Sequence, residues 1–60
     1  MLKLTYSDGR PVYVNQDLII KINVGDEGCS YLTMQGLSKD LMVTESPEKI
    51  MGMINNLKNN

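Results

Sequence analysis

The chain has 60 residues, with six Lys and Arg against seven Asp and Glu, one cysteine and no histidine. This length predicts one small domain over residues 1–60, whose core is marginal because so short a chain buries only about 60% of its unfolded surface. A disulfide within the chain is excluded, and one thiol without imidazoles cannot form a zinc site. Self-association or a protein partner is therefore expected to complete the core.

The charge distribution bears on two further classes of protein. The formal net charge of −1 is spread without a block of like charge, so the whole chain lacks the basic patch of a nucleic-acid-binding protein, and only a local basic stripe stays open. No apolar run reaches the roughly 18 residues of a membrane span. Together with the single unpaired thiol, these features predict a cytoplasmic protein.

Two alternating segments, residues 2–6 and 11–14, predict an N-terminal β-hairpin. Between them lies Asp8-Gly9, a pair that accepts the positive φ angles of tight turns. Alternation directs Tyr13 outward if its two neighbouring valines face the core.

Residues 18–24 predict a third strand because β-branched residues dominate the run. Strict alternation places Ile19 and Lys21 on the face away from the core. The residues expected on the core face are Leu18, Ile20, Ile22 and Val24. After a turn at residues 25–28, residues 29–35 and 40–44 predict two further strands.

The last segment changes to the helical period. Ser46 and Pro47 are typical of an N-cap and a first helical residue, and they predict a helix over residues 47–57. Its apolar stripe consists of Ile50, Met53, Ile54 and Leu57. Gly52 interrupts this helix at a cost of about 1 kcal/mol relative to Ala, which we interpret as a close helix–sheet contact. The predicted fold is mainly β: an antiparallel curled sheet or small open barrel of four or five strands with one C-terminal helix.

These patterns resemble the FlbD family of small flagellar-operon proteins. They resemble short uncharacterised proteins of bacteria and phages to the same degree. The resemblance spans about residues 2–54. Its motifs are residues 2–5, 8–10, 12–15, 17–19 and 43–48. It implies a small accessory protein of this fold with no known active site.

Catalysis is not expected, because the usual base for a nucleophile, histidine, is absent. Cys29 beside Ser30 is interpreted as a small core or interface residue. Asp26 and Glu27 are interpreted as a solvated turn tip. We predict no metal site and no cofactor.

Two functional hypotheses follow. The first is a non-enzymatic accessory protein that binds a partner or another copy, with Ile19 and Met42 at the interface. The alternative is a phage-type anti-defence protein that sequesters a nucleotide signal, cyclic or otherwise, in pockets at oligomer interfaces. Tyrosines stack on bases and cations pair with phosphates, whereas a purely structural role for the same residues remains open. The predicted ligand-binding residues are Tyr6, Arg10, Tyr13, Lys21 and Tyr31.

Overall fold

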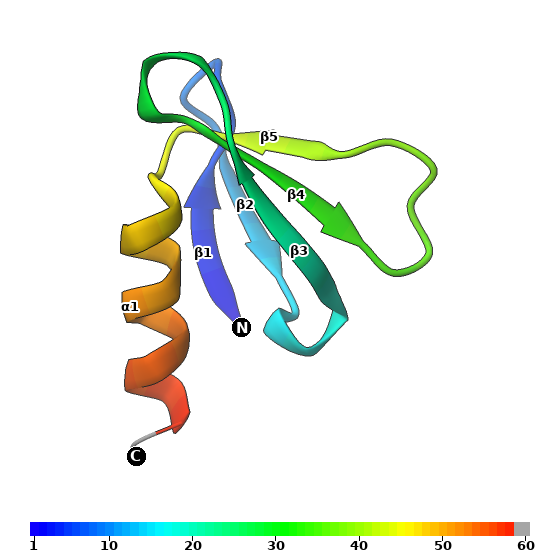
Figure 1. Cartoon of the computed structure of the whole chain (residues 1–60), viewed down its shortest axis with the longest axis vertical. Coiled ribbons are helices and arrows are strands. Elements are labelled where there is room, and N and C mark those ends of the chain that lie inside the picture. Colours follow the sequence, from blue (N-terminus) through cyan, green and yellow to red (C-terminus); the bar gives the residue numbers. More distant parts are fainter. Residues whose placement is uncertain (59–60) are drawn as a thin grey trace.

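The computed structural model describes residues 1–58, which form two antiparallel sheets, one α-helix and two short 3₁₀ turns, Gln16–Leu18 and Asp26–Gly28 (Figure 1). The first sheet pairs β1 with β2, and the second has the order β3-β4-β5. The elements are β1 (Leu2–Thr5), β2 (Pro11–Val14), β3 (Ile19–Val24), β4 (Ser30–Met34), β5 (Leu41–Val43) and α1 (Pro47–Lys58). The prediction of a mainly β fold with a C-terminal helix is confirmed. In the described residues the sheets do not close into a barrel.

A tight turn between β1 and β2 sets the first hairpin. The N–H of Gly9 donates to the carbonyl of Tyr6 at 3.0 Å, and the N–H of Tyr6 donates to the carbonyl of Arg10 at 2.8 Å. Gly9 has φ +94° and is the only residue of this turn with positive φ. Three-residue hairpin loops commonly end on such a left-handed residue, so the turn needs its glycine and not a left-handed aspartate.

The register of this hairpin confirms the predicted faces. Leu4 lies opposite Val12 on the core side, and Lys3 lies opposite Tyr13 on the outer side. Tyr13 is 62% exposed. Period-two alternation therefore holds throughout β1 and β2.

A β-bulge interrupts β3. Ile19 pairs with Met34 and Lys21 pairs with Thr33, which are consecutive residues of β4. Ile20 is therefore an extra residue on the β3 side of the ladder, which is the definition of a bulge.

The bulge changes which side chains of β3 face the core. Ile19 and Ile22 both pack against it, whereas Ile20 is 66% exposed. Leu18 and Val24 are exposed as well. The predicted common core face is wrong for Leu18, Ile20 and Val24. Leu18 ends a 3₁₀ turn (Gln16–Leu18) before β3 begins, and the bulge puts Ile19 on the core side in place of Ile20. Val24 has the parity of Ile22 but is exposed at the end of the strand.

Strands β1 and β5 meet where the two sheets approach each other. Tyr6 forms an isolated antiparallel bridge with Val43, and the N–H of Thr44 donates to the carbonyl of Thr5 at 2.9 Å. These contacts hold both sheets around one shared core. Its buried hydrophobic residues are Leu2, Leu4, Val14, Leu32, Met34, Val43 and Ile50.

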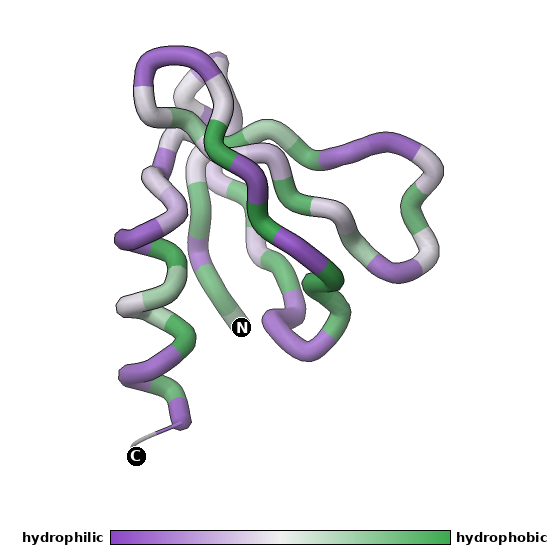
Figure 2. Tube along the Cα trace, viewed as in Figure 1, coloured by the Kyte–Doolittle hydropathy of each residue, from purple (hydrophilic) through white to green (hydrophobic). Residues whose placement is uncertain are grey.

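Helix α1 covers one side of this core (Figure 1). The hydroxyl of Ser46 accepts a hydrogen bond from the N–H of Lys49 at 3.2 Å, which confirms the predicted N-cap. Figure 2 shows hydrophobic residues recurring along α1, and among them Ile50 is fully buried. A Cβ on Gly52 would meet nothing within 4 Å, so the predicted close contact there is wrong.

Candidate functional site

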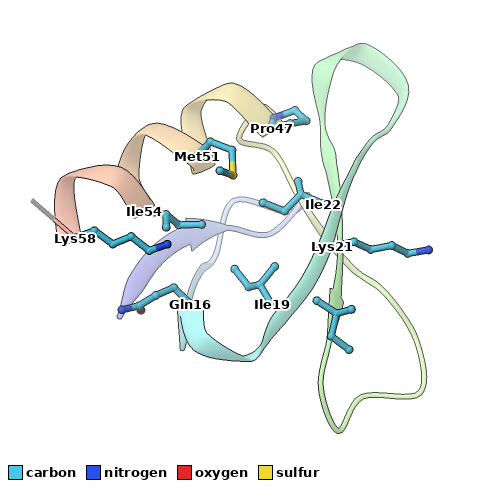
Figure 3. A pocket seen from close by; sticks show the side chains of 9 residues that line it. Gln16, Ile19, Lys21, Ile22, Pro47, Met51, Ile54 and Lys58 are labelled. Carbon is cyan, nitrogen blue, oxygen red and sulfur yellow. The ribbon is translucent and has the colours of Figure 1, made fainter.

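An apolar groove lies between β3 and α1, and we call it the helix groove (Figure 3). Its volume is about 400 Å³. The residues that line it are Gln16, Ile19, Ile20, Lys21, Ile22, Pro47, Met51, Ile54 and Lys58. Ile22 and Ile54 point into the groove in Figure 3, whereas the side chain of Lys21 points away from it.

A second apolar groove, the hairpin groove, lies between β2 and the connection from β4 to β5. Its volume is about 360 Å³. The residues that line it are Met1, Tyr6, Val12, Tyr13, Val14, Asn15, Leu18, Met34, Gln35, Leu37 and Leu41, and none of them carries a charged side chain. Leu37 is 55% exposed at this rim, so the groove is open to a partner.

The loop between β4 and β5 is shaped by two polar contacts. The hydroxyl of Thr33 donates to Oδ1 of Asp40 at 2.9 Å, which ties the two ends of the loop together. The N–H of Leu37 donates to the carbonyl of Met34 at 3.2 Å. This turn projects Leu37 into solvent beside the hairpin groove.

The predicted ligand-binding residues fall into two groups. Tyr6 and Tyr13 both line the hairpin groove, and Arg10 lies close by at the hairpin turn. The guanidinium carbon of Arg10 lies 5.3 Å from the ring centroid of Tyr6, and its Nε donates to Asp8 at 2.6 Å. The charge of Arg10 is therefore already paired within its own turn.

The other two predicted residues lie on the second sheet. Lys21 pairs with Thr33, and Tyr31 pairs with Asn23, on the face opposite the core. The ring of Tyr31 packs against Gly25, where a Cβ would lie 2.8 Å from its Cδ2 atom. The five predicted residues therefore do not form one pocket in the described chain.

The two predicted interface residues lie on opposite faces of the second sheet. Met42 pairs with Tyr31 on the outer face, and Met42 is 36% exposed. Ile19 faces the core because of the bulge. The exposed isoleucine is Ile20. The sequence signal for this exchange was the apolar run Leu18-Ile19-Ile20, because three consecutive apolar residues cannot all lie on one face of an alternating strand.

Among residues 1–58, the polar group with the most side-chain hydrogen bonds is the Glu45 latch, which consists of Thr5, Ser30 and Glu45. The Glu45 carboxylate accepts hydrogen bonds from the N–H and from the hydroxyl of Thr5, both at 2.9 Å. The carbonyl of Glu45 accepts from the hydroxyl of Ser30 at 2.7 Å. Ser30 is fully buried, so this bond satisfies its hydroxyl inside the core.

These contacts set the protonation of Glu45. Partial burial by itself raises the pKa of this carboxyl, but the two hydrogen bonds from Thr5 favour the charged form and outweigh it. The backbone N–H of Glu45 and the charge of Lys49 add to the lowering. The pKa of Glu45 therefore lies below its ordinary value, as for a structural carboxylate.

The chemistry-bearing residues are dispersed. Within residues 1–58, no three His, Cys, Asp or Glu side chains come together in a way that could hold a metal ion. Cys29 is a free, half-buried thiol. No helix among those residues is both long enough and apolar enough to cross a membrane. Comparison with protein-family models, with curated proteins and with solved structures found no match.

Proposed function

We propose that this chain is a non-catalytic accessory protein that binds another polypeptide, either a second copy or a different partner, through its exposed apolar side chains. The observation that carries the proposal is the distribution of large apolar residues. In the described chain, nine are exposed and only seven residues form the buried hydrophobic core. Monomeric proteins tolerate scattered exposed apolar residues, but contiguous apolar surface marks an interaction site.

Six of the nine exposed residues line one of the two grooves. Tyr13, Leu18 and Leu37 belong to the hairpin groove, and Ile20 and Met51 belong to the helix groove. A protein partner that covers either groove would add apolar burial to a core that is small at this chain length. An accessory role of this kind agrees with the resemblance to the FlbD family, and the single thiol supports a cytoplasmic location.

Nucleotide sequestration is the weaker proposal. It requires a cation near the tyrosines. Arg10 is engaged by Asp8 and Tyr6, and Lys3, which lies opposite Tyr13, does not line the hairpin groove. A nucleotide phosphate would have to compete with that carboxylate. A thermal-shift screen with mono-, di- and cyclic nucleotides addresses this proposal, because a ligand that binds the folded state raises the melting temperature.

Photo-crosslinking tests the main proposal. Benzoylphenylalanine replaces Tyr13 or Met51, one in each groove, and Lys39 or Glu48 as controls, because both controls are exposed and outside the grooves. Irradiation of cells that produce each variant is expected to yield a discrete crosslinked product from at least one groove position and none from the controls. Equal yields at all four positions, or none at the groove positions, would refute the proposal.

A further inference from the structure

One stripe of α1 lines the helix groove from end to end. The groove residues of α1 are spaced by four, three and four positions along the helix, and they are Pro47, Met51, Ile54 and Lys58. Residues at this spacing share one face of an α-helix. The stripe therefore runs from a proline, over two apolar side chains, to a lysine at the last residue of the helix.

The charged side chains that line this groove are all positive. Two of the six Lys and Arg residues line it, Lys21 and Lys58, and none of the seven Asp and Glu residues does. The chain as a whole carries a net charge of −1, so the groove has the opposite sign to the chain. The hairpin groove differs in this respect, because no charged side chain lines it.

The positive charge is concentrated at one end of the helix groove. Lys21 points away from it, whereas Lys58 lies with Gln16 at the end opposite Pro47 (Figure 3). Among residues 1–58, the ion pair that forms joins Arg10 to Asp8, so Lys58 has no carboxylate partner in the described chain. The Oε1 atom of Gln16 is buried and accepts no hydrogen bond from the described residues. This end therefore holds a cation and an acceptor that the chain itself does not satisfy.

We propose that the helix groove binds a segment of a partner polypeptide in which apolar side chains are followed by a carboxylate. This inference rests on the proposed function and names the chemistry of the partner. The apolar side chains of the segment cover Met51 and the rim at Ile20, both of which are exposed. The carboxylate pairs with Lys58. Opposite charges across an interface fix the direction in which a segment binds and exclude partners of the wrong sign.

The helix also sets the spacing expected in the partner. Lys58 follows Met51 by seven positions, which is about 10 Å at ~1.5 Å per residue. An extended segment covers that distance in about three residues, and a helical segment that lies along α1 needs about seven. The carboxylate is therefore expected about three positions from the apolar anchor over Met51 in an extended partner, and about seven in a helical one.

Two synthetic peptides test the sign of the charge. Both are capped, labelled with fluorescein and built from the same leucine and alanine residues, and they end in either two glutamates or two lysines. Fluorescence anisotropy at low salt measures their binding to the wild-type chain. The acidic peptide is expected to bind roughly two- to fivefold more tightly, which is the effect of one exposed ion pair.

Variants of Lys58 assign this preference to one side chain. Lys58→Gln should abolish the preference for the acidic peptide, and Lys58→Glu should reverse it. Lys39→Glu is the matched control, since it makes the same change of charge at an exposed lysine outside both grooves and should leave the preference as it is in the wild type. Far-UV circular dichroism verifies that each variant is folded.

A photoreactive leucine in the acidic peptide locates the site. After irradiation, mass spectrometry identifies the residues of the chain that carry the crosslink. The proposal expects them at the helix groove, at Ile20, Met51 or Ile54. Crosslinks at Tyr13 or Leu37 instead place the peptide in the hairpin groove and overturn the proposal.

The other outcomes are equally decisive. Equal affinity for the two peptides, no binding of the acidic peptide up to about 1 mM, or equal effects of Lys58→Glu and Lys39→Glu each overturn the proposal. Displacement of the acidic peptide by an equal concentration of decanoate would make a small amphiphile the occupant and overturn it too. So would a product of twice the 6.7 kDa mass from crosslinking at Met51, because a second copy then covers the groove.

These results are separate from the test of the proposed function. The peptide experiments address only the helix groove and the sign of its partner's charge. A partner crosslinked in cells at Tyr13 stands whatever the peptides do. The proposed function therefore fails only in its own experiment.

Discussion

Replacing Glu45 by alanine is expected to lower the free energy of unfolding by about 2 kcal/mol. The carboxylate receives two hydrogen bonds from Thr5, and a hydrogen bond to a charged group contributes about 1.5–3 kcal/mol. Because Glu45 is half-buried, water replaces part of the lost hydrogen bonding. We therefore take the loss of the two hydrogen bonds together to lie at the low end of this range, about 2 kcal/mol. For a domain of this size, about 1 kcal/mol corresponds to a 4–8 °C change in melting temperature, so a decrease of about 8–16 °C is expected.

The pH dependence separates the charge of Glu45 from its packing. A carboxyl whose pKa is lowered on folding contributes stability that is fully present above its unfolded pKa, about 4.3, and is lost as the pH falls through the folded value. Glu45→Gln removes this titration and keeps an acceptor for Thr5. The difference in stability between wild type and Glu45→Gln should therefore shrink between about pH 6 and about pH 3. Urea denaturation followed by far-UV circular dichroism at each pH measures the free energy of unfolding of both proteins.

Two further variants control this experiment. Glu48→Gln removes an exposed carboxylate from the same part of the chain and should change stability by at most about 1 kcal/mol through the helix dipole. Thr5→Val removes only the hydroxyl, and its double-mutant cycle with Glu45→Gln should show coupling of about 0.5–1.5 kcal/mol. All variants are compared at one protein concentration, because self-association makes stability depend on it. A pH-independent difference, or zero coupling, would refute the latch.

The remaining predictions concern packing and backbone, and thermal melts followed by circular dichroism measure each of them. Gly25→Ala should destabilise by about 1–3 kcal/mol, because its Cβ would enter the ring of Tyr31. Gly52→Ala should stabilise by up to about 1 kcal/mol, since nothing lies within 4 Å of its Cβ and alanine favours the helix. Equal shifts for the two glycines would contradict this interpretation. Leu32→Ala should cost about 2–5 kcal/mol because Leu32 is fully buried, and a cost under about 1 kcal/mol would show that its site is loosely packed.

Local patterns predicted the elements of this fold well. The first hairpin depends on the Asp8-Gly9 turn and on alternation, and α1 depends on Ser46, Pro47 and a helical stripe, all of which are readable within a few residues. The join between the sheets is different. Glu45 contacts Thr5 across 40 positions of sequence, and no local pattern links two residues so far apart.

The candidate site was predicted less well, for two physical reasons. The ligand set combined residues of both sheets, and their relative placement is a tertiary property: Tyr13 and Tyr31 lie on strands that do not pair. Of the two interface residues, Met42 is exposed as expected, but the outer placement of Ile19 is wrong because the face of a strand residue depends on the pairing with the neighbouring strand. The bulge at Ile20 exists only in the register of β3 against β4, which alternation within β3 alone does not reveal.

The bulge also bears on why β3 presents apolar residues to solvent. A regular strand would bury Ile20 in place of Ile19, so the bulge leaves the number of buried isoleucines unchanged and gives the core no extra apolar area. Full burial of an isoleucine side chain contributes about 1.5–3 kcal/mol, and in a core this small an exposed Ile20 forgoes a sizeable contribution. A partner that covers Ile20 at the helix groove, as proposed above, would recover this burial.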